Sequence, residues 1–273
     1  MSMRFRSVCS LLVALLMTTS ASAEYARATS NSSTRPTPAT AAPHDHSAAL
    51  AIAPDQRFNN VTYNGRFTFS RIMYRGTFGR RGGSSWSHDY PLADLNFPRI
   101  LEYMTTMRVT TGRSNVFTLD DPRIFQHPMI YISEPGFWTI TDSEALNLRE
   151  YMLKGGLVIL DDFENDQFYN MEAQMRRALP DLEMIEIGPD HEIFDSFFLI
   201  QNIYIPHPLV AVTPVYFAIF EDNDPDGRMM AIVNHNNDLA EYWEWSEGGY
   251  FPVDLTTEAY KIGVNYMIYA MTH

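Results

Sequence analysis

The stretch Gly155–Asp162 limits the fold of this chain more than any other part of its sequence. Its two glycines end a helical pattern, because glycine readily adopts the left-handed backbone that closes many helices. The next four residues, 157–160, are all apolar, and a strand without polar alternation is covered on both faces. The stretch therefore predicts a parallel sheet between layers of helices, with Asp161 and Asp162 at the carboxyl end of one strand.

Helical and extended patterns alternate along the rest of the chain. Thr141 and Glu144 have the spacing of a capping box, and Asp94 is the expected N-cap of an earlier helix over 97–104. Further patterns predict strands at 67–74, 108–111, 116–119, 129–133, 182–187, 215–220 and 229–233, and helices at 168–179 and 255–270. Strands separated by helices indicate a three-layer, mainly parallel α/β sheet. An α+β domain with an antiparallel sheet is the alternative.

The N-terminal residues predict export. Basic residues, a short apolar run and a small-residue cleavage site are typical of a signal peptide, here residues 1–23. Residues 24–57 are rich in Ala, Ser, Thr and Pro, which predicts a disordered linker. Residues 58–273 then suit a single α/β domain in the periplasm or outside the cell. The apolar run is too short to span a membrane, and no later segment of the expected mature chain suits a span.

Charge and cysteine content narrow the functions open to this chain. Its formal net charge is −13, which argues against nucleic acid and anionic lipid surfaces as partners. Cations, neutral glycans and basic protein faces remain. The single cysteine, Cys9, lies in the expected signal peptide, so we expect a mature protein without disulfides, thiolate metal sites or a cysteine nucleophile.

Asp161 and Asp162 are candidate catalytic and metal-binding residues. In open α/β sheets, ligands bind at the carboxyl ends of the strands. Glu164 and Asp166 follow closely, and such a run offers oxygen ligands to a hard divalent cation such as calcium or magnesium. It does not have the pattern of an EF-hand loop. The alternative is that these acids cap a turn or the start of a helix.

A second polar group, from His235 to Asp238, follows the apolar strand 229–233. At the same edge of the sheet, His235 and Asp238 could join the paired aspartates and activate a water molecule. The alternative is that Asp238 caps a helix starting near Leu239.

A basic, glycine-rich loop contains Arg75, Arg80 and Arg81. Arginine and exposed backbone N–H groups can bind an anion, so these residues are candidate ligand-binding residues, with Trp86, His88 and Asp89 as one wall of the same cleft. The alternatives are a solvated loop and a buried tryptophan with its polar supports.

Aromatic residues crowd between 242 and 251 among Glu241, Glu244 and Glu247. Aromatic faces beside carboxylates can hold a sugar or a cation. Ordinary packing explains the same spacing.

Several segments together resemble a known bacterial family. They are 67–71 with Tyr74, 86–94, 148–151 leading into 155–156 and 161–162, 191–194, and 263–265 with Tyr269. In order and spacing they are similar to the family called "domain of unknown function 4159". The resemblance runs from about Phe67 to Ala270.

The resemblance implies a flavodoxin-like sheet similar to class I glutamine amidotransferases, in a family with no established reaction. Those enzymes use a cysteine nucleophile, which this chain lacks after its leader. His191, a further candidate ligand-binding residue, stands in a turn that usually reads His-Pro and here reads His-Glu.

These observations predict an exported binding domain for an unknown small molecule or envelope protein. The alternative is a hydrolase in which Asp161 or Asp162, with His235 or His191, activates water, with or without a divalent cation as cofactor. A structural module tethered through its Pro-rich arm is the third hypothesis.

Overall fold

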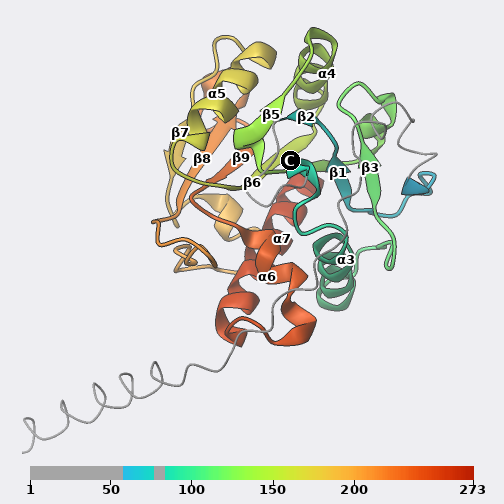
Figure 1. The fold of residues 1–273 in the computed structure, drawn as a ribbon, viewed down its shortest axis with the longest axis vertical. Helices are drawn as coiled ribbons and strands as arrows, with labels where there is room; N and C mark the ends of the chain where they lie inside the picture. Colours follow the sequence, from blue (N-terminus) through green and yellow to red (C-terminus); the bar gives the residue numbers. More distant parts are fainter. Residues whose placement is uncertain (1–57, 77–83) are drawn as a thin grey trace, which may run out of the picture. The chain divides into compact units, whose positions relative to one another are not determined.

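A computed structural model describes residues 58–76 and 84–273. The expected signal peptide and linker, and also Arg80 and Arg81, lie outside this described part. The domain is a mixed α/β structure around a seven-stranded, mostly parallel sheet (Figure 1). In order across the sheet, the strands are β3 (Asn115–Phe117), β1 (Ser70–Ile72), β4 (Met129–Ser133), β6 (Leu157–Phe163), β9 (Met229–His235), β8 (Val215–Phe220) and β7 (Ile185–Ile187). Two short strands, β2 (Arg75–Gly76) and β5 (Trp138–Thr139), pair separately.

The first five strands of this order confirm the predicted parallel sheet, and the last two depart from it. β8 runs antiparallel to β9, and β7 antiparallel to β8. Only residues 221–228 connect β8 to β9, and a parallel crossover needs about a dozen residues or more. A short connection between two apolar strands therefore makes a hairpin at this side of the sheet.

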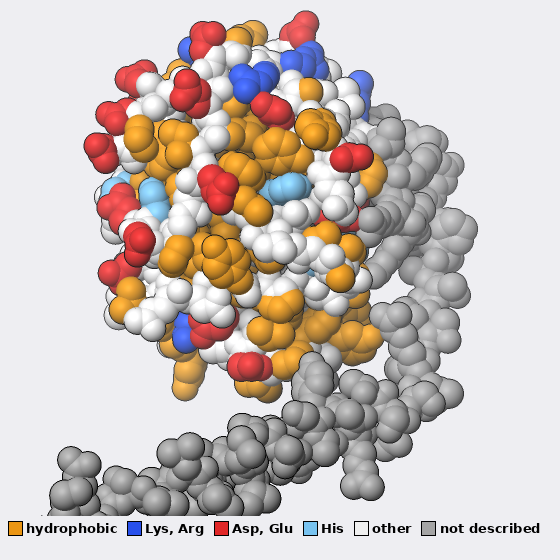
Figure 2. All heavy atoms as spheres, turned by 90° about the vertical axis from the view of Figure 1, so that its left-hand side faces the viewer, with side chains coloured by type: hydrophobic (Ala, Val, Ile, Leu, Met, Phe, Trp, Pro, Cys, Tyr) orange, Lys and Arg blue, Asp and Glu red, His pale blue; other side chains and the backbone are white. Residues whose placement is uncertain are grey.

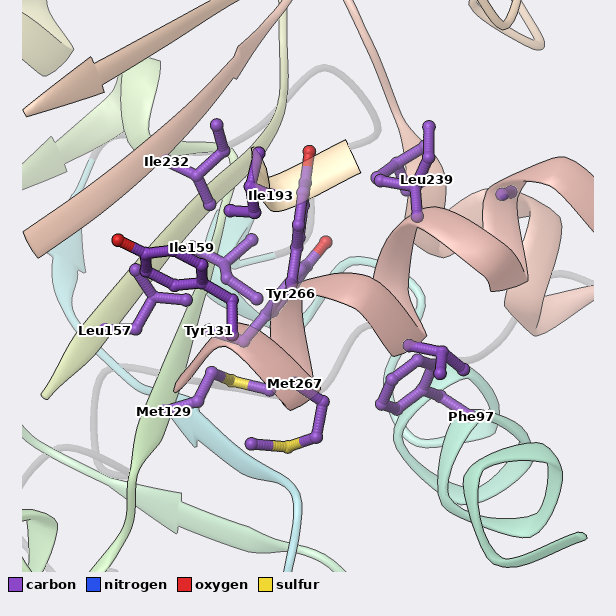
Figure 3. Close-up of a cluster of buried hydrophobic side chains, with 14 of the residues drawn as sticks. Phe97, Met129, Tyr131, Leu157, Ile159, Ile193, Ile232, Leu239, Tyr266 and Met267 are labelled. Carbon is purple, nitrogen blue, oxygen red and sulfur yellow. The ribbon is translucent and has the colours of Figure 1, made fainter. Parts of the chain in front are cut away.

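Helices cover both faces of the sheet (Figure 1). One face packs against α3 (Leu92–Met104), α6 (Leu239–Glu244) and α7 (Val253–Thr272), and the other against α4 (Asp142–Leu153) and α5 (Gln167–Ala178). Alternate residues of β6 contribute to the two cores, because successive side chains of a strand point to opposite faces. Figure 3 shows part of the first core, where Tyr131 and Ile159 of the sheet lie near Tyr266 of α7.

The ends of two helices test the expected caps. At α4, Thr141 and Glu144 form the predicted capping box, and Gly155 has a φ of 101° just beyond the helix. At α3 the expectation was wrong. The helix begins at Leu92, after Pro91, and Asp94 lies in its first turn. Asp94 is fully buried and binds Arg71 instead of capping the helix.

The surface reflects the acidic composition. Figure 2 looks onto the side of the molecule that carries the β7–β8 edge, and acidic side chains lie there around hydrophobic and uncharged ones. Within the described ranges, no helix combines the length and apolar character needed to cross a bilayer.

Candidate functional site

The carboxyl ends of β1, β4, β6 and β9 lie along one edge of the sheet. The order of the strands reverses at β1, because β3 lies on one side of it and β4 on the other. In open α/β sheets, ligands bind beside such a switch point. Tyr74 follows β1, Glu134 follows β4, Asp162 lies near the end of β6, and Asp238 follows β9.

A β-bulge separates the two neighbouring aspartates of β6. The register between β6 and β9 shifts between Leu160 and Phe163, and Asp162 has a φ of 62°. Its N–H donates to the carbonyl of Asn237 at 3.1 Å. Bulges of this kind redirect side chains beside active sites. Both aspartates therefore belong to β6, but their side chains lie in different surroundings.

The side chain of Asp161 faces the core and holds neighbouring elements in place. Its carboxylate accepts hydrogen bonds from the Tyr131 hydroxyl at 2.9 Å, the Asn234 amide at 3.0 Å, and the backbone N–H groups of Leu239 and Ala240 at 3.0 and 3.3 Å. The last two bonds hold the start of α6. Burial raises the pKa of Asp161 to about 6 against the opposing effect of these bonds. Because all of these donors belong to the fold itself, we assign a structural role to Asp161.

Asp162 faces the strand-end edge and binds His88. Its Oδ2 lies 2.5 Å from Nδ1 of His88 and accepts a hydrogen bond from the Ser133 hydroxyl at 3.2 Å. Burial lowers the pKa of His88, but the carboxylates of Asp162 and Asp89 outweigh it and raise the pKa to about 11. In the structure as described, this imidazole is therefore a cation paired with Asp162.

Arg71 fixes the segment that carries His88. Its guanidinium pairs with Asp94, with a shortest N–O distance of 2.6 Å, and both side chains are inaccessible to solvent. The same guanidinium donates to the carbonyl oxygens of Trp86 and His88 at 3.1 and 2.9 Å. A buried ion pair thus links β1 and α3 to the backbone next to the site.

Four buried acids converge at this edge, and we call them the carboxylate cluster: Asp89, Asp162, Asp238 and Glu241. Potential ligand atoms of Asp162, His207 and Asp238 lie within 4.8 Å of one another, as do those of His88, Asp238 and Glu241. Within the described residues, Oδ2 of Asp238, Oε2 of Glu241 and both carboxylate oxygens of Asp89 accept no hydrogen bond. These oxygens are buried without the polar partners that buried acids normally have.

The electrostatics of the cluster are unfavourable as it stands. Burial and the neighbouring carboxylates raise the pKa values of Asp89 and Asp238, and burial with Asp162 raises that of Glu134 to about 7. One imidazolium cannot neutralise four clustered carboxylates. The cluster must take up either protons or a cation, because buried unpaired charge is costly.

The backbone around the cluster adopts left-handed conformations that are uncommon for residues other than glycine. The φ angles are 60° at Asp89, 45° at Glu134, 62° at Asp162 and 58° at Asn236. Such strained positions gather at functional sites. Four of them at one strand-end edge mark this edge as the place to look for a ligand.

Of the residues named from the sequence, His88, Asp89, Asp162 and Asp238 are brought together. Asp238 also caps α6, because its Oδ1 accepts the N–H of Glu241 at 2.9 Å. Asp238 therefore caps the helix and also belongs to the carboxylate cluster, so the two predictions made for it do not exclude each other. Sequence reasoning gave no role to His207, and it placed Glu241 and Glu244 only among aromatic residues.

Other predicted residues lie apart from the cluster. His235 ends β9, contacts Phe168 of α5 and lies 3.2 Å from the carbonyl of Asn165, so it faces the opposite side of the sheet from Asp161. His191 packs against Phe220, whose strand partner Met229 begins β9. It therefore lies at the other edge of the sheet.

Two candidate ligand-binding residues have simpler surroundings. Trp86 is buried, with its ring centroid 5.5 Å from that of Phe58 and 6.0 Å from that of Tyr90. This is the packing alternative, not an open wall. Arg75 is exposed on β2.

Comparison with known proteins agrees with the resemblance noted in the sequence. A search of curated proteins finds no match to the chain. Residues 68–271 match the sequence model of the family described as "Domain of unknown function (DUF4159)". This match covers β1 to α7, and with them every member of the carboxylate cluster. The chain belongs to the DUF4159 family.

Proposed function

We propose that this chain is an exported ligand-binding domain that holds a divalent cation on Asp162 and Asp238. The observation that supports this most is the state of Asp238. Its side chain is inaccessible to solvent, and its Oδ2 has no hydrogen-bond donor among the described residues. One of its carboxylate oxygens lies within 4.8 Å of potential ligand atoms of Asp162 and His207. We call Asp162, Asp238 and the imidazole that completes the set the Asp162 site.

His207 is the imidazole whose ligand atom lies within 4.8 Å of those of both Asp162 and Asp238, so it completes this set. His88 is held differently, because its Nδ1 donates to Asp162, and a carboxylate that accepts from one ring nitrogen lies too far from the opposite ring nitrogen to share a cation with it. Nδ1 of His207 accepts the N–H of Leu209 at 3.2 Å, so binding of a cation to Nε2 of this ring would release the Nε2 proton. The His88 side chain is 21% exposed, so solvent reaches the cluster there.

The test is a thermal unfolding measurement on the full chain after treatment with a chelator. Adding Mg²⁺, Ca²⁺, Mn²⁺ or Zn²⁺ separately should raise the Tm, because a ligand of the native state stabilises it. At about 100 times Kd the gain is about 2.7 kcal/mol, or roughly 5–10 °C for a domain of this size.

Asp238→Asn provides the matched control. Asparagine keeps the capping acceptor for α6 but removes the charge, so the folded state should survive while the cation-dependent rise is lost. If none of the four cations raises the Tm of the unaltered chain, the cluster is balanced by protons and the proposal fails.

Hydrolysis is the second candidate function, and the His88–Asp162 pair favours it. A cation next to a solvent-accessible imidazole could activate water, with His88 or a neighbouring carboxylate handling the proton. Cation-dependent hydrolysis of p-nitrophenyl phosphate or p-nitrophenyl acetate, lost in Asp162→Asn, would support this function. Cation binding without hydrolysis of either ester would support the binding function and contradict the hydrolase function.

We also infer that the sheet is of the flavodoxin-like kind found in class I glutamine amidotransferases. The order β3–β1–β4–β6 supports this, because those four strands follow the flavodoxin-like pattern 2-1-3-4. The only cysteine of the chain is Cys9, so an amidotransferase-like sheet here would have no thiol nucleophile. Solving the structure by crystallography and comparing its topology with those enzymes tests this inference.

A further inference from the structure

A second group of acidic side chains lies beside the Asp162 site. Carboxylate oxygens of Asp89, Glu241 and Glu244 lie within 4.8 Å of one another. The group shares no residue with Asp162, Asp238 and their imidazole. We call it the Asp89 site.

Buried oxygens of Asp89 and Glu241 have no hydrogen-bond donor among the described residues. Asp89 is 4% exposed and Glu241 is 3% exposed, and neither oxygen of Asp89 nor Oε2 of Glu241 accepts a hydrogen bond within the described ranges. Nδ1 of His88 is 3.6 Å from Asp89 but 2.5 Å from Asp162, so its N–H donates to Asp162 and not to Asp89. The guanidinium of Arg71 is engaged by Asp94 and by two carbonyl oxygens.

The fold holds the three side chains in place. Glu241 and Glu244 are three residues apart on α6, which puts them on one face of the helix. The side-chain amide of Asn96 on α3 donates to the carbonyls of Trp243 and Glu244 at 3.0 and 3.2 Å. Asp89 precedes α3, and its carbonyl accepts the N–H of Ala93. The contact between α3 and α6 thus sets the position of the Asp89 site.

We propose that Asp89, Glu241 and Glu244 hold a second divalent cation next to the ion of the Asp162 site. This inference rests on the proposed function of the Asp162 site. The Asp89 site offers oxygen ligands only, which suit Mg²⁺, Ca²⁺ or Mn²⁺, whereas an imidazole in the Asp162 site also suits Zn²⁺.

A pair of cations would define the class of ligand. Two neighbouring ions hold the oxygens of a phosphate ester or a similar oxyanion between them. They would also reverse the local charge, because bound cations are the largest charges in such a site. A strongly acidic protein could in this way bind an anionic ligand at a cluster of carboxylates.

Mn²⁺ is the probe that tests this inference, because it suits both ligand sets and its free form is counted by electron paramagnetic resonance. Titration of the chelator-treated full chain should show two bound ions per chain. Neighbouring bound ions should also broaden each other's spectrum by spin coupling. Glu244→Gln should reduce the count to one and remove the coupling.

Glu247→Gln is the matched control, since Glu247 follows Glu244 by three positions but forms an exposed pair with Arg99. It should bind two ions. One ion in the unaltered chain, or two in Glu244→Gln, overturns the Asp89 site while the proposed function of the Asp162 site stands. No bound ion in the unaltered chain overturns both.

Discussion

At the scale of single residues, two adjacent aspartates of the same strand have different roles. Asp161 accepts four hydrogen bonds and holds the start of α6, whereas Asp162 contacts His88 and Ser133. The bulge between them makes this division possible.

The pair Asp161→Asn and Asp162→Asn tests the division. All four partners of the Asp161 carboxylate are hydrogen-bond donors, and in Asp161→Asn the new N–H₂ group cannot accept from them. The substitution should therefore lower the free energy of unfolding by about 1–3 kcal/mol with or without cations. Asp162→Asn weakens the pair with His88 but also relieves repulsion in the cluster, so it should lower the cation-free stability less than Asp161→Asn does and should remove the stabilisation by cations. Urea unfolding with and without Mn²⁺ measures both. Equal loss of cation-free stability in the two variants would contradict the assignment.

A pH dependence should arise from His127, far from the cluster in sequence and structure. Burial, with Arg123 adding to it and Asp121 opposing it, lowers the pKa of His127 to about 4. The unfolded chain takes up this proton near pH 6.5, so the contribution is complete above 6.5 and is lost as the pH falls towards 4. Between pH 7 and pH 5 this amounts to about 2 kcal/mol. His127→Phe should lack that part of the acid sensitivity, and identical slopes of stability against pH in the two proteins would refute it.

At the scale of elements, the contact of α7 with α3 and α6 depends on one glycine. A Cβ at Gly263 would lie 2.6 Å from a ring atom of Phe97 and 2.7 Å from one of Trp243. These rings are buried and cannot move aside without disturbing the core. The helices can approach this closely only because position 263 has no side chain.

Gly263→Ala should therefore destabilise the domain by about 1–3 kcal/mol, although alanine favours a helix more than glycine does. Because α6 carries Glu241 and Glu244 and is capped by Asp238, cation binding should weaken too. Gly248→Ala is the control, since a Cβ there meets nothing within 4 Å. Chemical unfolding measures the free energy of unfolding of both variants. A neutral or stabilising Gly263→Ala would show that the core can accommodate the extra methyl group.

The elements also show what the sequence could and could not predict. The capping box, Gly155 and the apolar run of β6 were readable because each depends on local chemistry. The pairing of Asp94 with Arg71 was not, because the partners are 23 positions apart and a buried ion pair leaves no local pattern. The hairpin of β8 and β9 could have been predicted from the short connection between them.

For the site, the sequence placed Asp162 and Asp238 at the same edge through the rule for parallel strands. It could not separate Asp161 from Asp162, because the bulge is a property of the pairing with β9. His207 lies on a long connection without a repeating pattern, so only the folded chain brings it near Asp162.

At the scale of the whole molecule, the boundary expected near residue 58 is testable. Phe58, the first described residue, is partly buried and packs its ring against Trp86 and Tyr90 beside the core. A shortened chain beginning at Phe58 should unfold cooperatively, with a Tm within about 2 °C of the full chain and the same response to Mn²⁺. Calorimetry of the two chains makes the comparison, and loss of the cooperative transition on shortening would place the boundary earlier.

The helix α6 gives this protein a built-in optical probe. Trp243 lies on the helix and Trp245 follows directly after it, and these are two of the four tryptophans in the chain. They alternate with the acidic positions 241 and 244, so a change in how tightly this short segment is held alters the surroundings of an indole. Intrinsic fluorescence of the unlabelled chain can therefore follow the occupancy of the strand-end edge in real time, with no dye and no substrate.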